Sequence, residues 1–269
     1  MTNAIQVNGL RKSYGAKEVL KGIDLCVRRG DIFALLGVNG AGKTTTLECI
    51  EGLRKYDGGS ISVNGSIGIQ LQSAALPAHI KGMEAVRLFS KWNRTNADTS
   101  MLAALGADSI ANKQYQEMST GQKRRLHLAL ALIRNPDIVF LDEPTAGLDV
   151  EGRISLHEYI RNLKGQGKTI LLASHDMAEV ESLCDSIAIL KDGEIAFQGT
   201  VMELTEKIGK HYNIHIQTDK GTEHYESDDI GNSLLAILKH YQEKNMMIQD
   251  IQVDRGSLEQ HFLKIAKGE

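Results

Sequence analysis

The chain has 269 residues, enough for one large domain or for one domain with a small appendage. Its 42% hydrophobic and 24% charged residues are typical of a globular protein, and a net charge of −3 gives no overall attraction to nucleic acid. Its apolar stretches are too short to span a bilayer, and residues 1–15 lack the apolar core of a secretion signal. The three cysteines show no CxxC spacing, which argues against a metal or redox role. We therefore expect a cytoplasmic protein with no nucleic-acid partner.

The N-terminal part of the chain reads as short apolar strands separated by turns, with one helix directly after a glycine-rich loop. The expected strands are 4–9, 25–30, 31–37, 60–65 and 66–72. The expected helix covers 44–53 and ends before a second glycine-rich stretch.

From about residue 82 to 135 the apolar spacing becomes helical, with expected helices at 82–92, 99–106 and 122–135. Buried strands return at 137–143 and 168–175, and an amphipathic helix, 151–167, lies between them. This alternation predicts an α/β domain around a largely parallel sheet. The helical block, about 73–135, is expected to be an inserted subdomain.

After residue 190 the pattern changes to that of a small α+β domain without catalytic motifs. Residues 190–199 predict a hairpin that turns on Asp192-Gly193, and a helix is expected at 201–209. Two strands then precede a helix at 233–242, a strand at 247–253 and a helix at 257–266. We place the domains at 1–205 and 206–269.

Residues 37–45, GVNGAGKTT, form a phosphate loop of the pattern G-x-x-x-x-G-K-[S/T]. Its glycines let successive backbone N–H groups point at phosphate oxygens, and the following helix adds its positive end. Lys43 is expected to reach the β- and γ-phosphates of a nucleoside triphosphate, and the Thr44 hydroxyl to coordinate Mg²⁺. The residues expected at the nucleotide are Gly37, Val38, Asn39, Gly40, Ala41, Gly42, Lys43, Thr44 and Thr45.

A second string, IVFLDEPTAGLD at 138–149, is an apolar strand that ends in two carboxylates. Asp142 is expected to hold the hydration shell of the metal, on a strand beside the phosphate loop. Glu143 is the candidate general base that polarises the attacking water. A solvated carboxylate pair at a strand end is the alternative, which the LDEP context disfavours.

Between these strings stands MSTGQKRRL, residues 118–126. Ser119 is expected to cap the helix that begins here, and Gly121 to keep the helix N-terminus open to a close-packed partner. From these residues alone, a plain capped helix and a second anion site are equally good interpretations.

Together, the three strings make residues 1 to about 205 resemble the nucleotide-binding domain of ATP-binding cassette (ABC) proteins. The segment MSTGQ resembles the LSGGQ signature of that family. The resemblance implies a P-loop NTPase fold with a RecA-like core, an N-terminal antiparallel β subdomain and an inserted helical subdomain. It implies an ATPase, which converts ATP and water to ADP and phosphate. It also implies that Ser119, Thr120, Gly121 and Gln122 act in trans on ATP bound by a second subunit. Thr120 stands where the family pattern has glycine, although its N–H remains available.

Other family elements stand at matching positions. Tyr14 resembles the aromatic residue that stacks on adenine, and His175 resembles the histidine that contacts the γ-phosphate and steadies the attacking water. Residues 146–149, AGLD, resemble the loop that crosses the dimer seam, with Asp149 as its polar contact. We call these four residues the seam loop.

Gln72 resembles the glutamine that touches magnesium, although Gln70 shares its strand face and is the alternative. The spacing after the Ile-Gly pair favours Gln72. The resemblance therefore implies that magnesium is held by Thr44, Gln72 and Asp142, and that the catalytic residues are Glu143, His175 and Lys43. No family element is missing, which favours active hydrolysis over nucleotide binding alone.

The resemblance further implies an ABC transporter subunit that pairs with a second ATPase subunit and docks, through its helical block, on a separate membrane permease. Such a subunit is peripheral on the inner face of the cell membrane. Residues 250–268 resemble the C-terminal pattern of bacterial multidrug and antibiotic exporter ATPases, which favours export of a drug, antibiotic, peptide or polysaccharide. An importer ATPase and a soluble cassette ATPase of translation, repair or cluster assembly are the alternatives. A homodimer and a heterodimer both fit.

Overall fold

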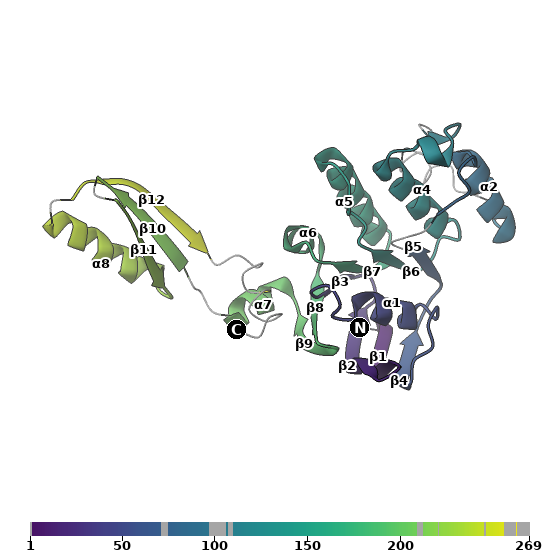
Figure 1. The fold of residues 1–269 in the computed structure, drawn as a ribbon, viewed down its shortest axis with the longest axis horizontal. Helices are drawn as coiled ribbons and strands as arrows, with labels where there is room; N and C mark the ends of the chain where they lie inside the picture. Colours follow the sequence, from purple (N-terminus) through teal and green to yellow (C-terminus); the bar gives the residue numbers. More distant parts are fainter. Residues whose placement is uncertain are drawn as a thin grey trace. The chain divides into compact units, whose positions relative to one another are not determined.

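The computed structural model describes residues 2–70, 75–96, 106, 110–208, 212–219, 221–244, 246–255 and 262. The chain forms two compact units, Met1–Gln198 and Gly199–Glu269 (Figure 1). The expected boundary at 205/206 lies later in the chain, within helix α7 (Val201–Ile208), which belongs to the second unit. Apart from Gly106 and Phe262, the expected helices at 99–106 and 257–266 lie outside the described residues.

The N-terminal unit is built on a six-stranded sheet in the order β5-β6-β7-β3-β8-β9. The strands are β3 Ile32–Leu36, β5 Ile67–Gln70, β6 Ile138–Asp142, β7 Thr169–Ser174, β8 Ser186–Lys191 and β9 Glu194–Gly199. Strand pairs β5–β6, β6–β7, β7–β3 and β3–β8 are parallel. Every residue of β3, β6 and β7 is buried, as expected for strands covered on both faces. The predicted α/β domain with a largely parallel sheet is confirmed.

A second, antiparallel sheet has the order β2-β1-β4, with β1 Asn3–Tyr14, β2 Lys17–Arg28 and β4 Gly58–Val63. Strands β1 and β2 extend beyond the predicted apolar runs, up to the pair Tyr14↔Lys17. Backbone pairing continues there through polar residues because that half of the ladder faces solvent. The apolar faces of both sheets share one core with helix α1 (Lys43–Ile50).

The remaining helices are α2 Gly82–Trp92, α4 Thr120–Leu132, α5 Val150–Gly165 and α6 Met177–Leu183, with a 3₁₀ turn, η2, at Tyr115–Glu117. Helix α4 packs against α2 and β5, so the helical block lies at the β5 edge of the sheet (Figure 1). Helix α6 was not predicted, because seven residues are too few to give a clear helical period. Among the described helices, none is long and apolar enough to cross a membrane.

The predicted hairpin at 190–199 is confirmed. Asp192 and Gly193 have φ angles of 48° and 83°, the two positive values that a type I′ turn requires.

The C-terminal unit contains an antiparallel sheet of order β11-β10-β12 and one long helix. Its elements after α7 are β10 Tyr212–Thr218, β11 Gly221–Ser227, α8 Ile230–Glu243 and β12 Ile248–Arg255. Ile214 and Ile216 of β10 pack against Ile237 and Tyr241 of α8. This is the small α+β unit that the sequence predicts.

Candidate functional site

The phosphate loop follows β3, the central buried strand, and leads into α1. Gly37 passes so close to the main chain of Leu190 that an added Cβ would lie 2.6 Å from its carbonyl oxygen. Gly42, the N-cap of α1, has a φ of 111°, a conformation open essentially to glycine. Among the described residues no side chain caps α1 at Gly42, so its first backbone N–H groups remain available for an anion.

Lys43 is held at the inner side of this loop. Its side chain is buried, with the residue 7% exposed, and its Nζ donates to the carbonyl oxygens of Gly37 (2.7 Å) and Val38 (3.3 Å). Burial lowers the pKa of Lys43, and the nearby charges of Glu143 and Asp142 oppose that shift. The positive charge of the buried Lys43 ammonium group is therefore incompletely balanced by the protein, and an anionic phosphate would stabilise it.

Asp142 lies at the end of β6 and reaches the first turn of α1, where its Oδ2 accepts a 3.4 Å hydrogen bond from the Thr44 hydroxyl. Strand β7 separates β6 from β3, so the strand of Asp142 is not the direct neighbour of the strand that leads into the loop. Desolvation by burial raises the pKa of Asp142, and the charge of Glu143 raises it further. A desolvated carboxylate beside a hydroxyl is a donor pair that fits Mg²⁺.

Glu143 has a φ of 46°, which is uncommon for a residue other than glycine. Its N–H donates to the carbonyl oxygen of Ala173 on β7, which secures the backbone as the chain leaves β6. His175, just beyond β7, places Nδ1 3.2 Å from Oε1 of Glu143. The strained turn thus brings the candidate base and the candidate histidine together.

Lys43, Thr44 and Glu143 border a cavity of about 340 Å³, whereas His175 lines a second cavity of about 260 Å³ that also includes Glu143. The lining of the first cavity includes Tyr14, Asn39, Gly40, Gly42, Lys43, Thr44, Thr45 and Glu143. The ring of Tyr14 is 43% exposed, and the Arg54 guanidinium lies 5.3 Å from its centre. A flat exposed ring at the rim of a phosphate-binding loop is suited to stacking on a base.

Gln72 lies outside the described residues. Its alternative, Gln70, is 2% exposed, and among the described residues neither of its amide atoms has a hydrogen-bond partner. Gln70 lines a separate cavity of about 230 Å³ with Phe89 of α2 and His127 of α4. The structure therefore gives Gln70 no place in the cavity around Lys43.

Ser119 caps α4 as predicted. Its Oγ accepts from the N–H of Gln122 (3.3 Å), and the Ser119 N–H donates to Oε1 of Gln122 (3.1 Å). This reciprocal pair is a capping box. Oε1 of Gln122 also accepts from Nζ of Lys113, which ties the signature segment, residues 119–122, to the chain before η2.

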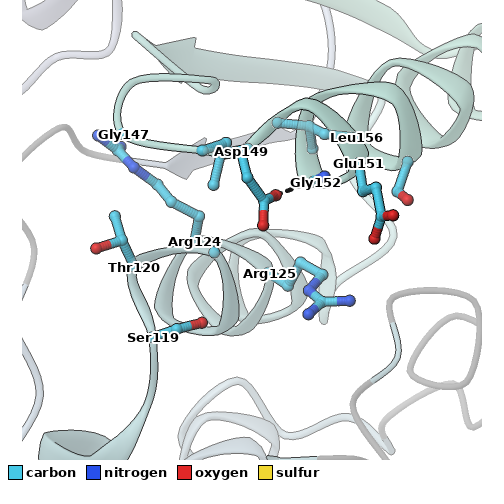
Figure 2. Close-up of a pocket in the computed structure, with 12 residues that line it drawn as sticks. Ser119, Thr120, Arg124, Arg125, Gly147, Asp149, Glu151, Gly152 and Leu156 are labelled. Carbon is cyan, nitrogen blue, oxygen red and sulfur yellow. Dashed lines mark hydrogen bonds between the residues drawn. The ribbon is translucent and has the colours of Figure 1, made fainter.

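Residues 119–121 of the signature segment and residues 147–149 of the seam loop line one cavity of about 410 Å³ (Figure 2). Arg124 and Arg125 of α4 also line this cavity, together with the carboxylates of Asp149 and Glu151. Both arginines belong to the run Lys123-Arg124-Arg125, whose sequence alone did not indicate a role. Among the described residues, this cavity and the cavity around Lys43 share no lining residue. The phosphate loop and the signature segment therefore line two separate cavities.

Asp149 of the seam loop caps helix α5, since its Oδ1 accepts from the N–H of Gly152 at 2.8 Å. An added Cβ at Gly147 would lie 3.3 Å from Cγ2 of Thr120. The threonine that replaces the family glycine therefore packs close to the seam loop.

Glu51, at the C-terminal end of α1, was missed by the sequence analysis because nothing in its local pattern marks it. Desolvation raises its pKa to about 7, helped by the charges of Asp142 and Glu48. The pKa of Glu51 is higher in the folded protein than its ordinary value of 4.5, so the fold favours the protonated form. The free energy of unfolding therefore falls as the pH rises from about 4.5 to about 7.

We expect Glu51→Gln to raise the free energy of unfolding by about 1–3 kcal/mol at pH 8 and to have little effect at pH 4.5. Urea unfolding of the nucleotide-free protein in a chelator, at both pH values, measures this. The matched control is Glu158→Gln on the exposed face of α5. An equal effect of Glu51→Gln at both pH values would contradict the account.

A family profile described as ABC transporter matches residues 20–146. The chain is 34% identical to the linearmycin resistance ATP-binding protein LnrL of Bacillus subtilis, over 76% of this chain and 72% of that protein. It is 31% identical to the daunorubicin resistance ATP-binding protein DrrA3 of Streptomyces coeruleorubidus, over 97% of this chain and 95% of the relative. It is 36% identical to the Nod factor export ATP-binding protein I of Ralstonia nicotianae, over 77% and 71%.

A solved structure of an ATP-binding subunit of an ABC transporter has a TM-score of 0.69 and 28% identity, over 76% of this chain and 93% of that one. The fold class predicted for residues 1 to about 205 is thereby confirmed. The three sequence strings, the sheet order and these likenesses all agree. The chain belongs to the ATP-binding cassette family, as an ATP-hydrolysing subunit of an ABC transporter.

Proposed function

We propose that this chain hydrolyses Mg-ATP at a site shared by two subunits and thereby drives export through a separate membrane permease. One observation carries the proposal: the phosphate loop and the signature segment line two separate cavities of the chain. A second copy, or a similar subunit, brings the missing half to each phosphate loop. In a two-fold dimer of identical chains this completes two sites at once.

Within one subunit, Lys43 and the N–H groups at the start of α1 bind the phosphates, and Tyr14 stacks on the adenine. Thr44 and Asp142 hold Mg²⁺, together with Gln72. When bound, the metal neutralises phosphate charge and orients the triphosphate. Glu143 accepts a proton from the attacking water, and His175 holds Glu143 and that water in line with the γ-phosphate.

The second subunit contributes the N-terminus of its helix α4. Ser119, the N–H groups of Thr120 and Gly121, and Gln122 meet the triphosphate from the opposite side. Asp149 makes the polar contact across the seam. Closing the dimer also removes water from the site, which strengthens each of these electrostatic contacts.

Export is supported by the relatives. One of them is named for Nod factor export, and two are named for resistance to antibiotics. The alignment with DrrA3 spans nearly the whole chain, including the C-terminal unit. The permease is a separate chain in this proposal, and the helical block at the β5 edge docks on it.

We expect a tagged chain, isolated in mild detergent from membranes of its source organism, to retain a multi-spanning membrane protein. Inside-out membrane vesicles holding that pair should accumulate an antibiotic from a test panel when ATP is added. Lys43→Ala is the control and should leave the pair intact without transport. Recovery of the chain in soluble fractions alone would contradict a transporter role, and ATP-driven efflux from the vesicles would contradict export.

A further inference from the structure

His175 lies on the short connection between β7 and α6, and both of its neighbours, Ser174 and Asp176, make side-chain hydrogen bonds. Ser174, which precedes it, donates from Oγ to Oε2 of Glu179 at 2.6 Å. The same Oγ accepts from the N–H of Asp176 at 3.0 Å. One buried hydroxyl thus bridges the residues on either side of His175 and depends on Glu179 for its orientation.

Glu179 is 2% exposed, an unusual place for a carboxylate. Its ion-pair partner among the described residues is His157, whose Nε2 lies 3.4 Å from Oε1. A buried carboxylate is costly unless its oxygens are hydrogen-bonded, so these contacts hold Glu179 in one geometry.

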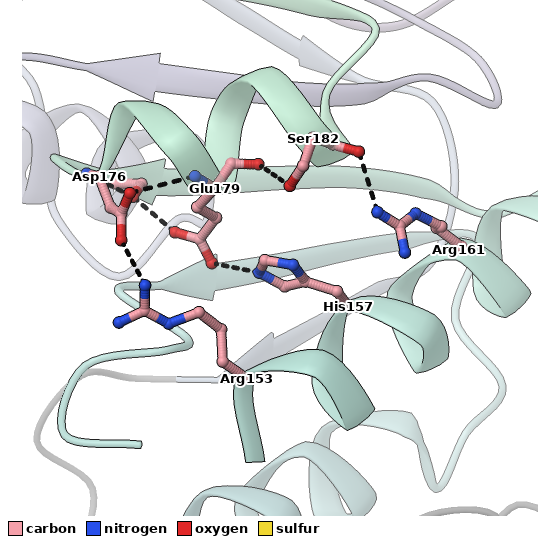
Figure 3. Close-up of polar contacts among 7 residues, drawn as sticks. Arg153, His157, Arg161, Asp176, Glu179 and Ser182 are labelled. Atoms are coloured by element: carbon pink, nitrogen blue, oxygen red, sulfur yellow. Dashed lines mark hydrogen bonds and ion pairs between the residues drawn. The ribbon is translucent and has the colours of Figure 1, made fainter. Parts of the chain in front are cut away.

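Two residues of α5 reach this region: Arg153 contacts Asp176 in the connection, and His157 contacts Glu179 of α6 (Figure 3). Arg153 donates from Nη1 to Oδ2 of Asp176 at 3.0 Å, and Asp176 caps α6 by accepting from the N–H of Glu179. His157 stands four residues after Arg153, so both side chains lie on one face of α5. Asp149 of the seam loop is the N-cap of α5, and this helix therefore links the seam loop to the backbone of His175.

We propose that Glu179 is a positioning residue, which acts through Ser174 and, with His157, holds His175 against Glu143 for hydrolysis. The inference rests on the proposed role of His175. The influence of Glu179 on His175 passes through the Ser174 hydroxyl and the backbone of residues 174–176. Misplacing a reacting group by about 1 Å costs up to 10²-fold in rate.

Glu179→Gln keeps the size of the side chain and removes the charge. We expect kcat for ATP hydrolysis to fall about 10- to 100-fold while KM for ATP changes less than about twofold. In a His175→Ala background the same substitution should change kcat by less than about twofold, because its target is gone. Glu181→Gln, on the exposed side of α6, is the matched control and should leave kcat unchanged.

A normal kcat for Glu179→Gln would overturn the proposal, and so would an undiminished loss in the His175→Ala background. If Glu179→Gln does not fold, Ser174→Ala carries the same test, with the same expected loss of kcat and the same dependence on His175. A His175→Ala variant with normal turnover would refute the proposed role of His175 itself. The alternative result, in which His175→Ala loses turnover but Glu179→Gln does not, would refute only the role of Glu179.

Discussion

Glu143→Gln is expected to bind ATP with nearly wild-type affinity and to hydrolyse it about 10²–10⁴-fold more slowly. This is the range by which a general base accelerates a reaction. Glutamine preserves the shape of the side chain and its contact distance to His175, but an amide does not accept a proton from water. The phosphate contacts of Lys43 and of α1 do not involve this carboxylate, so binding should persist.

Because the variant binds ATP and does not hydrolyse it, we expect it to accumulate as an ATP-bound closed dimer, visible by size-exclusion chromatography with light scattering. Glu158→Gln, exposed on α5, serves as the control and should turn over normally. Normal turnover by Glu143→Gln would refute its role as the base.

Ser119→Arg is expected to reduce hydrolysis by at least about 10²-fold, as loss of a charge-stabilising donor does, while ATP binding persists. The substitution removes the cap of α4 and places a long cationic side chain at the rim of the 410 Å³ cavity. Because that cavity shares no described lining residue with the one around Lys43, the subunit's own nucleotide contacts remain intact.

The measurement is a fluorescent-nucleotide titration beside a phosphate-release assay. Losing an N-cap costs about 0.5–2 kcal/mol of stability, so Thr200→Arg, which removes the cap of α7, is the control for that effect. Loss of ATP binding in Ser119→Arg would place the signature segment beside its own phosphate loop and contradict the shared site.

The parts of the site that lie within one short segment could be predicted from sequence. The phosphate loop, the cap at Ser119 and the end of β6 at Asp142 all follow from local chemistry: glycine conformations, a capping box and an apolar strand that stops at a carboxylate. The tight turn at Asp192-Gly193 is local in the same way.

What could not be predicted depends on residues far apart in sequence. Strand β7 lies between β6 and β3, and the apolar pattern of the individual strands does not predict this strand order. The raised pKa of Glu51 comes from burial beside Asp142, about ninety residues later. Glu179 and His157 meet only because α5 packs beside α6. The Ser-His-Asp run at residues 174–176 indicated only that the connection after β7 carries polar side chains.

The central claim is that the phosphate loop of one subunit works with the signature segment of another. It is tested most directly by mixing the two inactive variants, Ser119→Arg and Glu143→Gln, in equal amounts and measuring phosphate release. In a mixed dimer the first variant supplies an intact Glu143 and the second an intact Ser119. One complete site forms in each mixed dimer, so the mixture should recover about a quarter of the wild-type sites if subunits pair at random. A mixture as inactive as its components would contradict the shared site.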